Sequence, residues 1–437
     1  PIEHPDLKAG AEYWLNVSFT LPTATPWADA GHEVAREQLQ LPYDVPEKPI
    51  VDESTMKPID VTDTEDAVTV NGTNFEIVFD KATGTLSSYD YNGTQLIKEG
   101  PKPGFWRAPN DNEKYNGMPG RTRTWREAGE NWQVQNVTVT EKSSKAVEII
   151  VDATLPTTNE SDYTLSYTIY GSGEVVVDNT LEPGNNLPEI PVVGTTLTIP
   201  EEFEQMTWYG RGPYENYWDR NKGSFVGQYS GTVDEQYTPY ISPQETGNKT
   251  DVRWVTLTNE DGVGLKAEGL PLMEVSALHY TPQDLDSASH PYKLTRRDDI
   301  TLRLNYKQMG LGGDDAWGAR PHPEFTLPAD QSYSYSYKLS PVSDEEPGPE
   351  ISAALIKERV EQLEAEGAFE DERTAHTLKT HLIAVDRYEQ QKDAHKVIKH
   401  LHNFKLLLDH QRENDLITDK AYHALWADTD ALIRKWE

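Results

Sequence analysis

The sequence predicts a mainly β protein whose last part is a small α-helical bundle. Up to about residue 342, apolar and polar residues alternate with a period of two, which is typical of half-buried strands. Turn-forming residues interrupt these runs at intervals of roughly 8–12 residues, as in large antiparallel sandwiches. Beyond residue 350, apolar residues instead recur every three to four positions, the spacing of one helix face.

Residues 1–45 hold only one or two strands. The run AEYWLNVSFTL places Tyr13, Leu15, Val17 and Phe19 on one face of a half-buried strand. A β-sandwich needs roughly seven strands, so this stretch is too short to form one. We expect it to be the last strands of a domain that begins upstream, in a fragment or in one subunit of a split protein.

Residues 46–342 are predicted to form the main β domain. Within it, Asn74–Ile97 gives a strand, a turn at Lys81–Gly84, a second strand, and then Asn92-Gly93, a dipeptide typical of hairpin turns. The runs KAVEIIVDATL, YTLSYTIYGSGEVVVDNTL and YSYSYKLSPV repeat the alternation. Long antiparallel strands with few helices predict a large sandwich.

The character of the chain changes at residues 343–350, where SDEEPGPE is acidic and contains two prolines. We expect a linker there, followed by a small antiparallel helical bundle over residues 351–437. Asp371 and Thr418 are expected N-caps. The helical spacing is carried by Leu378, Leu382, Val385 and Tyr388, and then by Val397, Leu401, Phe404 and Leu408.

The composition of the 437 residues excludes several classes of function. There is no cysteine, so disulfides, thiolate metal sites and a thiol nucleophile are excluded. With 40 basic and 73 acidic residues the formal net charge is −33, which disfavours nucleic acid and anionic membrane partners. No run reaches the roughly 20 apolar residues of a membrane helix. Many of the 11 Trp and 22 Tyr must belong to the core, but exposed Trp and Tyr rings are also how proteins hold sugars, by stacking on apolar C–H faces.

Seven of the twelve histidines lie in the predicted bundle. A metal site would need two or three of them to converge with a carboxylate, whereas their spacing spreads them over several helix faces. We therefore predict no metal site and expect solvated surface side chains at His376, His381, His395, His400, His402, His410 and His423.

Retaining glycosidases use two carboxylates roughly 5–5.5 Å apart. In many barrel glycosidases the acid/base is a Glu that directly follows an Asn, and three dipeptides here have this form: Asn112-Glu113, Asn159-Glu160 and Asn259-Glu260. None follows a buried strand that alternates with helices, which is the barrel context. We predict no catalytic residue in this chain.

Three segments combine Arg, Asp and Asn with aromatic residues: Gly104–Arg121, Trp208–Gly231 and Thr238–Asn259. Buried arginines must pair, so we expect their charges mainly to lock long loops over the sandwich. In the first segment FWRAP is an expected anchor, and the polar tip after it is expected to move. The expected locking residues are Arg211, Glu215, Asp219, Arg220, Asp251 and Arg253.

A fourth segment, Met309–Phe325, reads MGLGGDDAWGARPHPEF. It is too rich in glycine for the interior of a helix or strand. Its glycines are expected to allow a sharp backbone turn, and its two aspartates to fix that turn by hydrogen bonds. The tryptophan is then either a platform for a sugar or a plug in the core.

In this order and spacing, FWRAPNDN, WYGRGPYENYWDR, TPYISPQETGNKTDVRW and GLGGDDAW resemble the C-terminal domain of lacZ-type β-galactosidases of glycoside hydrolase family 2, which is a separate small subunit in split members. The resemblance covers roughly residues 46–342. ATPWADAGHEVAREQLQLP further resembles the end of the preceding immunoglobulin-like domain. The helical tail is similar to modules appended to secreted hydrolases of Gram-positive bacteria, which favours a secreted or extracellular protein.

The resemblance implies a galactose-mutarotase-like β-supersandwich that serves a catalytic barrel absent from this chain. It implies that Trp317 reaches the barrel's active site and stacks on a galactoside, with Asp314 and Asp315 beside it. It further implies a mobile loop near the site at Glu113, Lys114, Tyr115, Asn116 and Gly117. This sequence departs from the family there, because the expected DND reads Asp111-Asn112-Glu113.

The resemblance also implies partners and cofactors. The partners would be the barrel portion, covalently upstream or in a separate chain, and the substrate, with a homo-oligomer possible in the family. No cofactor is expected in this chain, and Mg²⁺ and Na⁺ would belong to the missing barrel.

Two other functions stay open. One is a sugar-binding or scaffold module without enzymatic activity. The other is a mutarotase-like epimerase, since that fold hosts such enzymes. An epimerase needs a general acid and a general base, typically His and Glu. Among His279, His290 and His322, only His279, in ALHYTP, is a plausible base.

Overall fold

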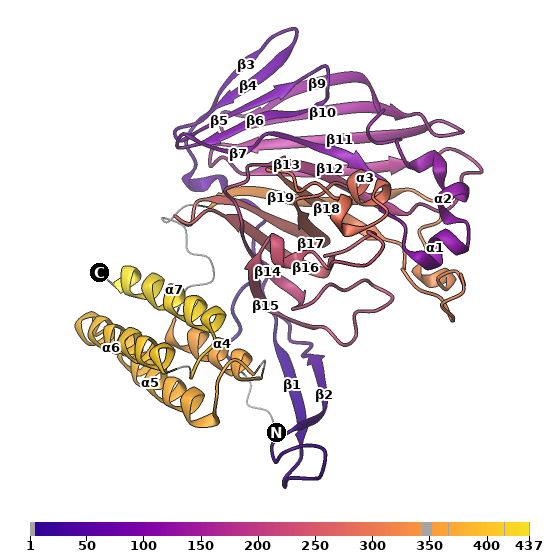
Figure 1. Cartoon of the computed structure of the whole chain (residues 1–437). Helices are drawn as coiled ribbons and strands as arrows, with labels where there is room; N and C mark the ends of the chain where they lie inside the picture. Colours follow the sequence, from indigo (N-terminus) through magenta and orange to yellow (C-terminus); the bar gives the residue numbers. More distant parts are fainter. Residues whose placement is uncertain (1–4, 343–351, 366, 415, 437) are drawn as a thin grey trace. The chain divides into compact units, whose positions relative to one another are not determined.

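The computed structural model describes residues 5–342, 352–365, 367–414 and 416–436. The chain divides into two compact units, Pro1–Ser343 and Asp344–Glu437, and each is described by itself. The predicted linker at residues 343–350 lies outside the described part. The predicted architecture, mainly β with helices at the C-terminal end, is confirmed (Figure 1).

The first unit begins with a separate two-stranded antiparallel sheet made of β1 (Trp14–Thr20) and β2 (Glu33–Gln40). Phe19, predicted to lie on a half-buried face, is exposed, because this small sheet has no second layer over that end among the described residues. Several contacts attach the hairpin and the residues just before it to the rest of the unit, and two of them use paired hydrogen bonds. The Glu12 carboxylate accepts two hydrogen bonds from Arg253, both 2.8 Å long. The Gln38 amide pairs with the backbone of Val226, as donor at 2.8 Å and as acceptor at 2.7 Å.

Seventeen further strands form one connected antiparallel system. The first six make a meander: β3 (Asp60–Asp63), β4 (Ala67–Asn71), β5 (Phe75–Asp80), β6 (Thr85–Tyr91), β7 (Thr94–Ile97) and β8 (Glu99–Gly104). Asn92 and Gly93 have φ values of 51° and 83° between β6 and β7, so the predicted hairpin turn is confirmed.

The remaining strands pair in a different order from the sequence. One run is β9 (Gln133–Ser143), β10 (Ala146–Leu155), β11 (Ser161–Tyr170), β12 (Val175–Glu182), β19 (Tyr333–Val342), β17 (Gly264–Leu278), β16 (Lys249–Thr258), β14 (Gln205–Gly212) and β15 (Phe225–Thr232). The second half of β17 pairs instead with β18 (Ile300–Gln308), which leads through β13 (Val192–Ile199) to β8. The long strand β17 therefore serves both runs.

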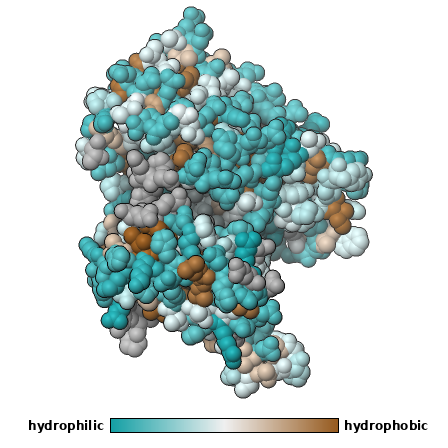
Figure 2. Space-filling model, turned by 60° about the vertical axis from the view of Figure 1, so that its left-hand side comes forward, coloured by the Kyte–Doolittle hydropathy of each residue, from teal (hydrophilic) through white to brown (hydrophobic). Residues whose placement is uncertain are grey.

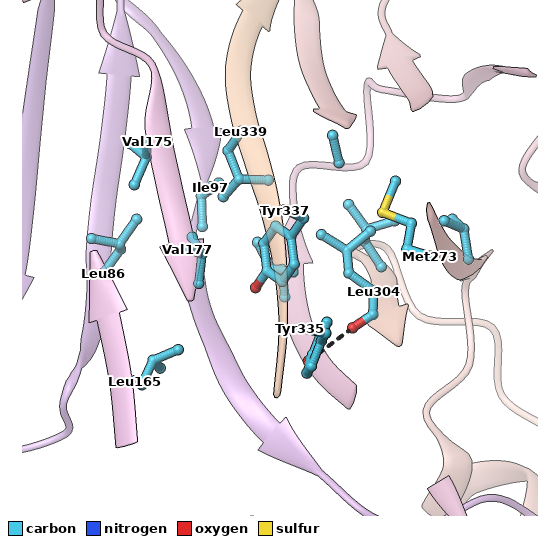
Figure 3. Packing of buried hydrophobic residues seen from close by; sticks show 14 of the residues in the cluster. Leu86, Ile97, Leu165, Val175, Val177, Met273, Leu304, Tyr335, Tyr337 and Leu339 are labelled. Atoms are coloured by element: carbon cyan, nitrogen blue, oxygen red, sulfur yellow. Dashed lines mark hydrogen bonds between the residues drawn. The ribbon is translucent and has the colours of Figure 1, made fainter. Parts of the chain in front are cut away.

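Apolar side chains from the two layers meet in one core. Figure 3 shows Leu86, Leu165 and Val177 on one side and Leu304 and Met273 on the other, with the strand that carries Tyr335 and Tyr337 between them. The hydroxyl group of Tyr335 donates a hydrogen bond of 3.3 Å to the carbonyl oxygen of Leu304. Burial of the alternating positions is what fixes the strand register.

Short helices lie in the loops between the strands of this unit. They are α1 (Asp111–Tyr115), α2 (Met118–Arg121) and α3 (Pro282–Ser287), with 3₁₀ turns at Glu53–Thr55, Arg123–Trp125, Asp234–Gln236, Pro291–Lys293 and Pro323–Phe325. In Figure 1 α1 and α2 lie at the same end of the sandwich as the loop that leads from β18 to β19. This end holds the candidate site.

The second unit is a bundle of α4 (Ala353–Ala365), α5 (Glu372–Gln390), α6 (Ala394–Glu413) and α7 (Asp419–Trp436). The two apolar series predicted from helical spacing point into its core. Asp371 caps α5 by accepting from the N–H of Thr374 at 2.8 Å, and Thr418 accepts from the N–H of Ala421 at 3.3 Å. Both predicted caps are confirmed.

The surface of the molecule is mostly hydrophilic. Figure 2 shows one face on which hydrophobic residues are scattered and form no continuous band. Among the described helices, none combines the length and the apolar character needed to cross a membrane.

Candidate functional site

A depression of about 530 Å³ opens at the end of the sandwich that carries α1. All four segments singled out from the sequence line it, although about 200 residues separate the first from the last. The first segment contributes Asn110–Asn112, the second Asp219 and Arg220. The third contributes Tyr240, Gln244 and Glu245, and the fourth Leu311–Asp314, with His322 and Phe325 behind it.

A buried ion pair lies beneath one side of the depression. Arg107 and Glu113 are 0% and 1% exposed and in direct contact. Arg107 also donates to the carbonyl oxygens of Met309 and Gly310, the latter at 3.0 Å, and so holds the start of the fourth segment. Burial opposes the positive charge, but the adjoining Glu113 carboxylate keeps the pKa of Arg107 above its ordinary value.

The segment predicted as a mobile loop is a structured turn at this point. Glu113 closes a capping box with Asn110 at the start of α1, in which each side chain accepts from the other residue's N–H at 2.9–3.0 Å. Lys114 and Tyr115 continue the helix, Asn116 ends it, and Gly117 follows in a left-handed conformation. The polar composition suggested a solvated tip, but Glu113 turns inward because the anchoring arginine needs a partner. The movement of this segment stays a prediction.

A second buried pair lies beneath the other side. Arg303 on β18 donates to Glu245 at 2.9 Å, and Gln308 donates to the other oxygen of the same carboxylate at 2.9 Å. The backbone N–H of Gln308 donates in turn to buried Glu274 at 3.1 Å. Desolvation raises the pKa of Glu274 to about 8, so this group is a neutral acid at neutral pH. Glu245 and Glu274 were missed from the sequence, where nothing but their place beside arginine-rich segments marked them.

The predicted locking residues do pair. Arg211 contacts Asp251 at 2.5 Å and Arg220 contacts Glu215 at 2.7 Å. Burial alone would raise the pKa of Glu215, but hydrogen bonds from Tyr240, from the N–H of Gly247 and from Arg220 hold it below its usual value. The loops around the depression are thus held by charges.

Asp219 fixes the beginning of the fourth segment. One of its oxygens accepts from the N–H groups of Leu311 and Gly312, at 2.8 and 3.0 Å. A Cβ added at Gly310 would lie 2.8 Å from this carboxylate, and one at Gly313 would lie 2.5 Å from the carbonyl oxygen of Ala319. These two glycines therefore permit close approach, and neither has the positive φ of a left-handed turn. That they also allow a sharp turn stays a prediction.

The turn that presents Trp317 is built by Asp315. Its carboxylate accepts from the N–H of Trp317 at 2.8 Å and from the N–H of Ala319 at 3.2 Å. Gly318 has φ +99°, and its backbone packs against Tyr115. Trp317 itself is 83% exposed, so its ring does not plug the core of the described unit.

Asp314 lies at the lip of the depression. Its carboxylate contacts Nε2 of His322 at 2.8 Å, and this hydrogen bond raises the pKa of the imidazole. Three exposed apolar side chains lie close in the sequence to residues that line the depression, and we call them the rim. Tyr115, 72% exposed, is three residues after Asn112, and Ile241, 85% exposed, directly follows Tyr240. Trp317 is three residues after Asp314, and the lining itself is mostly polar.

The remaining histidine and carboxylate candidates lie elsewhere. His279 is buried, with Nδ1 2.9 Å from the carbonyl oxygen of Arg297 and Nε2 2.7 Å from Glu204. Both ring nitrogens are engaged, which leaves no free base for epimerisation. In the described part of the chain no group of three or more His, Asp or Glu side chains is arranged to hold a metal ion.

Comparison with known proteins identifies the family of the sandwich that carries this depression. Residues 71–339 match the model of the β-galactosidase small chain. The chain belongs to this family. Residues 1–42 match domain 4 of β-galactosidases, and residues 353–434 match the FIMAH domain.

The relatives of this chain are in agreement with the family match, because they are β-galactosidases. The β-galactosidase of Priestia megaterium is 44% identical over 331 residues, which cover 76% of this chain and 32% of that protein. The β-galactosidase of Streptococcus thermophilus is 32% identical over 336 residues, 77% of this chain and 32% of that protein. The chain thus spans about a third of the length of these relatives.

Solved structures with a similar course of the chain are more distant. A galactose 1-epimerase from Lactobacillus acidophilus has a TM-score of 0.35 at 10% identity, over 66% of this chain and 100% of that one. An aldose epimerase homologue from C. elegans has a TM-score of 0.37 at 10% identity, over 65% and 98%. No residue role is carried over from them.

Proposed function

We propose that this chain is the non-catalytic C-terminal part, or small subunit, of a β-galactosidase that hydrolyses terminal non-reducing β-D-galactose residues. The catalytic carboxylates would lie in the two thirds of the relatives' length that this chain does not span, together with any Mg²⁺ or Na⁺ site. The match to the β-galactosidase small chain and the similarity to the β-galactosidases of Priestia megaterium and Streptococcus thermophilus support this proposal.

One observation carries the proposal: four distant segments line one depression, and three of them also carry an exposed apolar side chain within three residues of the lining. Tyr115, Ile241 and Trp317 gain nothing for the stability of this unit by being exposed. Their supporting residues, in contrast, are held by buried ion pairs. A rigid base under an apolar rim is expected of a surface that receives a partner.

We infer different roles for the three predicted site residues. Trp317 would stack on the apolar face of the sugar bound in the barrel. Asp315 would position that ring, because its oxygen is used by the turn. Asp314, at the lip, would bind a sugar hydroxyl group. Lys114 and Tyr115 would contact the barrel portion as the partner closes on α1.

The test uses the whole gene product that contains this sequence. Trp317→Ala is expected to raise KM for a galactoside by roughly 5- to 150-fold, the equivalent of one lost aromatic stack. Tyr292→Ala is the matched control, because Tyr292 is 79% exposed, close to the 83% of Trp317, and lies outside the four segments that line the depression. An unchanged KM in Trp317→Ala would reject the platform role and favour a scaffold module without substrate contact.

The isolated chain is expected to show no turnover of a chromogenic β-galactoside, and activity should return only with the barrel portion present. Turnover by the purified chain, with contaminating enzyme excluded, would contradict the proposal. We further propose that the assembled enzyme is secreted and homo-oligomeric; fractionation of culture medium and light scattering test these two points.

A further inference from the structure

The loop that carries Trp317 connects β18 to β19, and its two legs approach each other closely. The backbone N–H of Gly310 donates to the carbonyl oxygen of Phe325 at 2.7 Å. Farther along, a Cβ added at Gly313 would lie 2.5 Å from the carbonyl oxygen of Ala319. The loop therefore has a narrow neck, and Trp317, 83% exposed, lies in the sequence between the two residues that close it.

One side-chain pair crosses from leg to leg, and we call it the neck pair. Nε2 of His322, on the returning leg, lies 2.8 Å from the Asp314 carboxylate on the outgoing leg. Pro321 and Pro323 flank His322 and restrict the backbone on both sides of it, and His322 has the extended φ of −61° and ψ of 150° expected before a proline. The Asp314 side chain is 83% exposed, so much of its carboxylate stays open to solvent.

The turn around Trp317 is otherwise held from within and from α1. The Asp315 carboxylate is used inside the turn, where it accepts from the N–H of Trp317. The side-chain amide of Asn112 donates to the carbonyl oxygen of Asp315 at 3.2 Å. Of these contacts, the neck pair of His322 and Asp314 is the one whose strength changes with the protonation of a side chain.

We propose that His322 is a positioning residue for Trp317 and Asp314, and that its protonation sets how tightly the assembled enzyme holds a galactoside. This inference rests on the proposed function, in which Trp317 and Asp314 meet the sugar. His322 acts through them: it holds the two legs of the loop together, and it occupies one oxygen of Asp314 while the other is left for a sugar hydroxyl group.

Two carboxylates face the imidazole of His322. The hydrogen bond with Asp314, and then the charges of Asp314 and of Glu324, which lies 3.7 Å from Nδ1, raise the pKa of His322 above its ordinary value. A protonated imidazole forms a charge-assisted hydrogen bond, which is stronger than a neutral one. The neck pair is therefore strongest at low pH and weakens as the pH rises through the pKa of His322. The other charged residues that line the depression with His322 are Asp111, Asp219, Arg220 and Glu245.

The experiment measures KM and kcat of the whole gene product for a chromogenic β-galactoside between about pH 6 and pH 8.5. His322→Gln keeps a hydrogen-bond donor and loses the charge. Its KM is expected to exceed that of the wild type about two- to fivefold at the low end of this range, the contribution of an exposed charged pair, and to approach it at the high end. The value of kcat should stay within about twofold, because the pair acts on substrate binding.

His290→Gln is the matched control, since His290 is exposed and lies outside the four segments that line the depression. Its KM should follow that of the wild type at every pH. The ratio of each variant to the wild type removes the titration of groups in the barrel portion. A His322→Gln ratio that is the same at every pH would indicate a merely structural role and would overturn the proposal.

A second measurement needs no activity. In this chain, the NMR titration of His322, identified by the signal that His322→Gln removes, should give a lower pKa in Asp314→Asn than in the wild type. An unchanged pKa would show that the neck pair does not form in solution, which also overturns the proposal. Trp317→Ala in the whole gene product separates the two proposals. If it raises KM while His322→Gln has no effect at any pH, this inference alone fails; if neither variant changes KM, the platform role fails as well.

Discussion

The base and the rim of the depression are built in opposite ways. In the base, Arg107 and Arg303 are buried against Glu113 and Glu245. At the rim, Trp317 and its apolar neighbours are exposed to solvent. The comparison separates residues that hold the site from residues that touch something outside it. The first kind should reveal itself in stability and the second in binding, which the following substitutions test.

The largest effect is expected for Glu113→Ala. It leaves Arg107 buried without its carboxylate, which costs about 3–5 kcal/mol of unfolding free energy. Glu33→Ala is the control, because its pair with Arg36 is exposed and 3.8 Å apart and should contribute less than about 1 kcal/mol. Denaturant unfolding of the sandwich transition measures both. Equal small losses would show that the buried pair does not hold the base.

Glu274→Gln should change how stability depends on pH. The pKa of Glu274 is raised to about 8 in the folded chain, so the folded state keeps a proton that the unfolded state releases near its ordinary pKa. The contribution of Glu274 to the unfolding free energy of the wild type is therefore largest at low pH. It falls by a few kcal/mol as the pH rises toward about 8. The neutral glutamine removes this slope.

Melting of wild type and Glu274→Gln between about pH 5 and pH 7.5 isolates the effect. Burial lowers the pKa of Lys249 to about 8, so this lysine begins to lose its proton near the upper end of that range; its contribution is the same in both proteins and cancels in the comparison. Parallel curves for the two proteins would contradict a protonated Glu274.

Gly318→Ala tests the connection between base and rim. A Cβ at this position would lie 2.9 Å from Cβ of Tyr115, on a residue with φ +99°. We expect a loss of about 1–3 kcal/mol from backbone strain. Gly120→Ala is the matched control, since it lies in α2 with no atom within 4 Å of the added Cβ. An unchanged unfolding free energy in Gly318→Ala would mean that the turn can relax to make room for the added Cβ.

The smallest effect on stability is expected for Trp317→Ala, within about 0.5 kcal/mol, because the ring is exposed. Trp208→Ala, in the core of the same unit, should cost about 3–5 kcal/mol. Thermal unfolding of the two variants compares a rim ring with a core ring. A large loss for Trp317→Ala would place its ring in a structural role.

Local features of this fold could be predicted where the chemistry is local. Asn92-Gly93 specifies its turn because both residues readily adopt a positive φ. Asp371 caps its helix because its carboxylate accepts from the N–H of Thr374, three residues later. The meeting of four segments in one depression could not be predicted from spacing, because strand order, and not sequence order, decides which loops share an end. The recognised order of motifs supplied that information only by resemblance.

Two features of the site show what local composition leaves out. The sequence predicted a mobile loop at residues 113–117, and its movement stays a prediction; the pairing of the Glu113 carboxylate with buried Arg107 was not predicted. Gly310 and Gly313 were expected to allow a sharp turn, and the structure adds that Asp219 and Ala319 approach them closely.

The pairing of Gln38 with Val226 has a further consequence. In the described chain, the ladder partner of β15 is β14. The backbone N–H and C=O of Val226 on β15 are both bound by the side-chain amide of Gln38, which belongs to the hairpin of β1 and β2. Unpaired N–H and C=O groups along a strand can template pairing with another chain. At Val226 a side chain saturates the backbone, and it cannot propagate a ladder as another strand would.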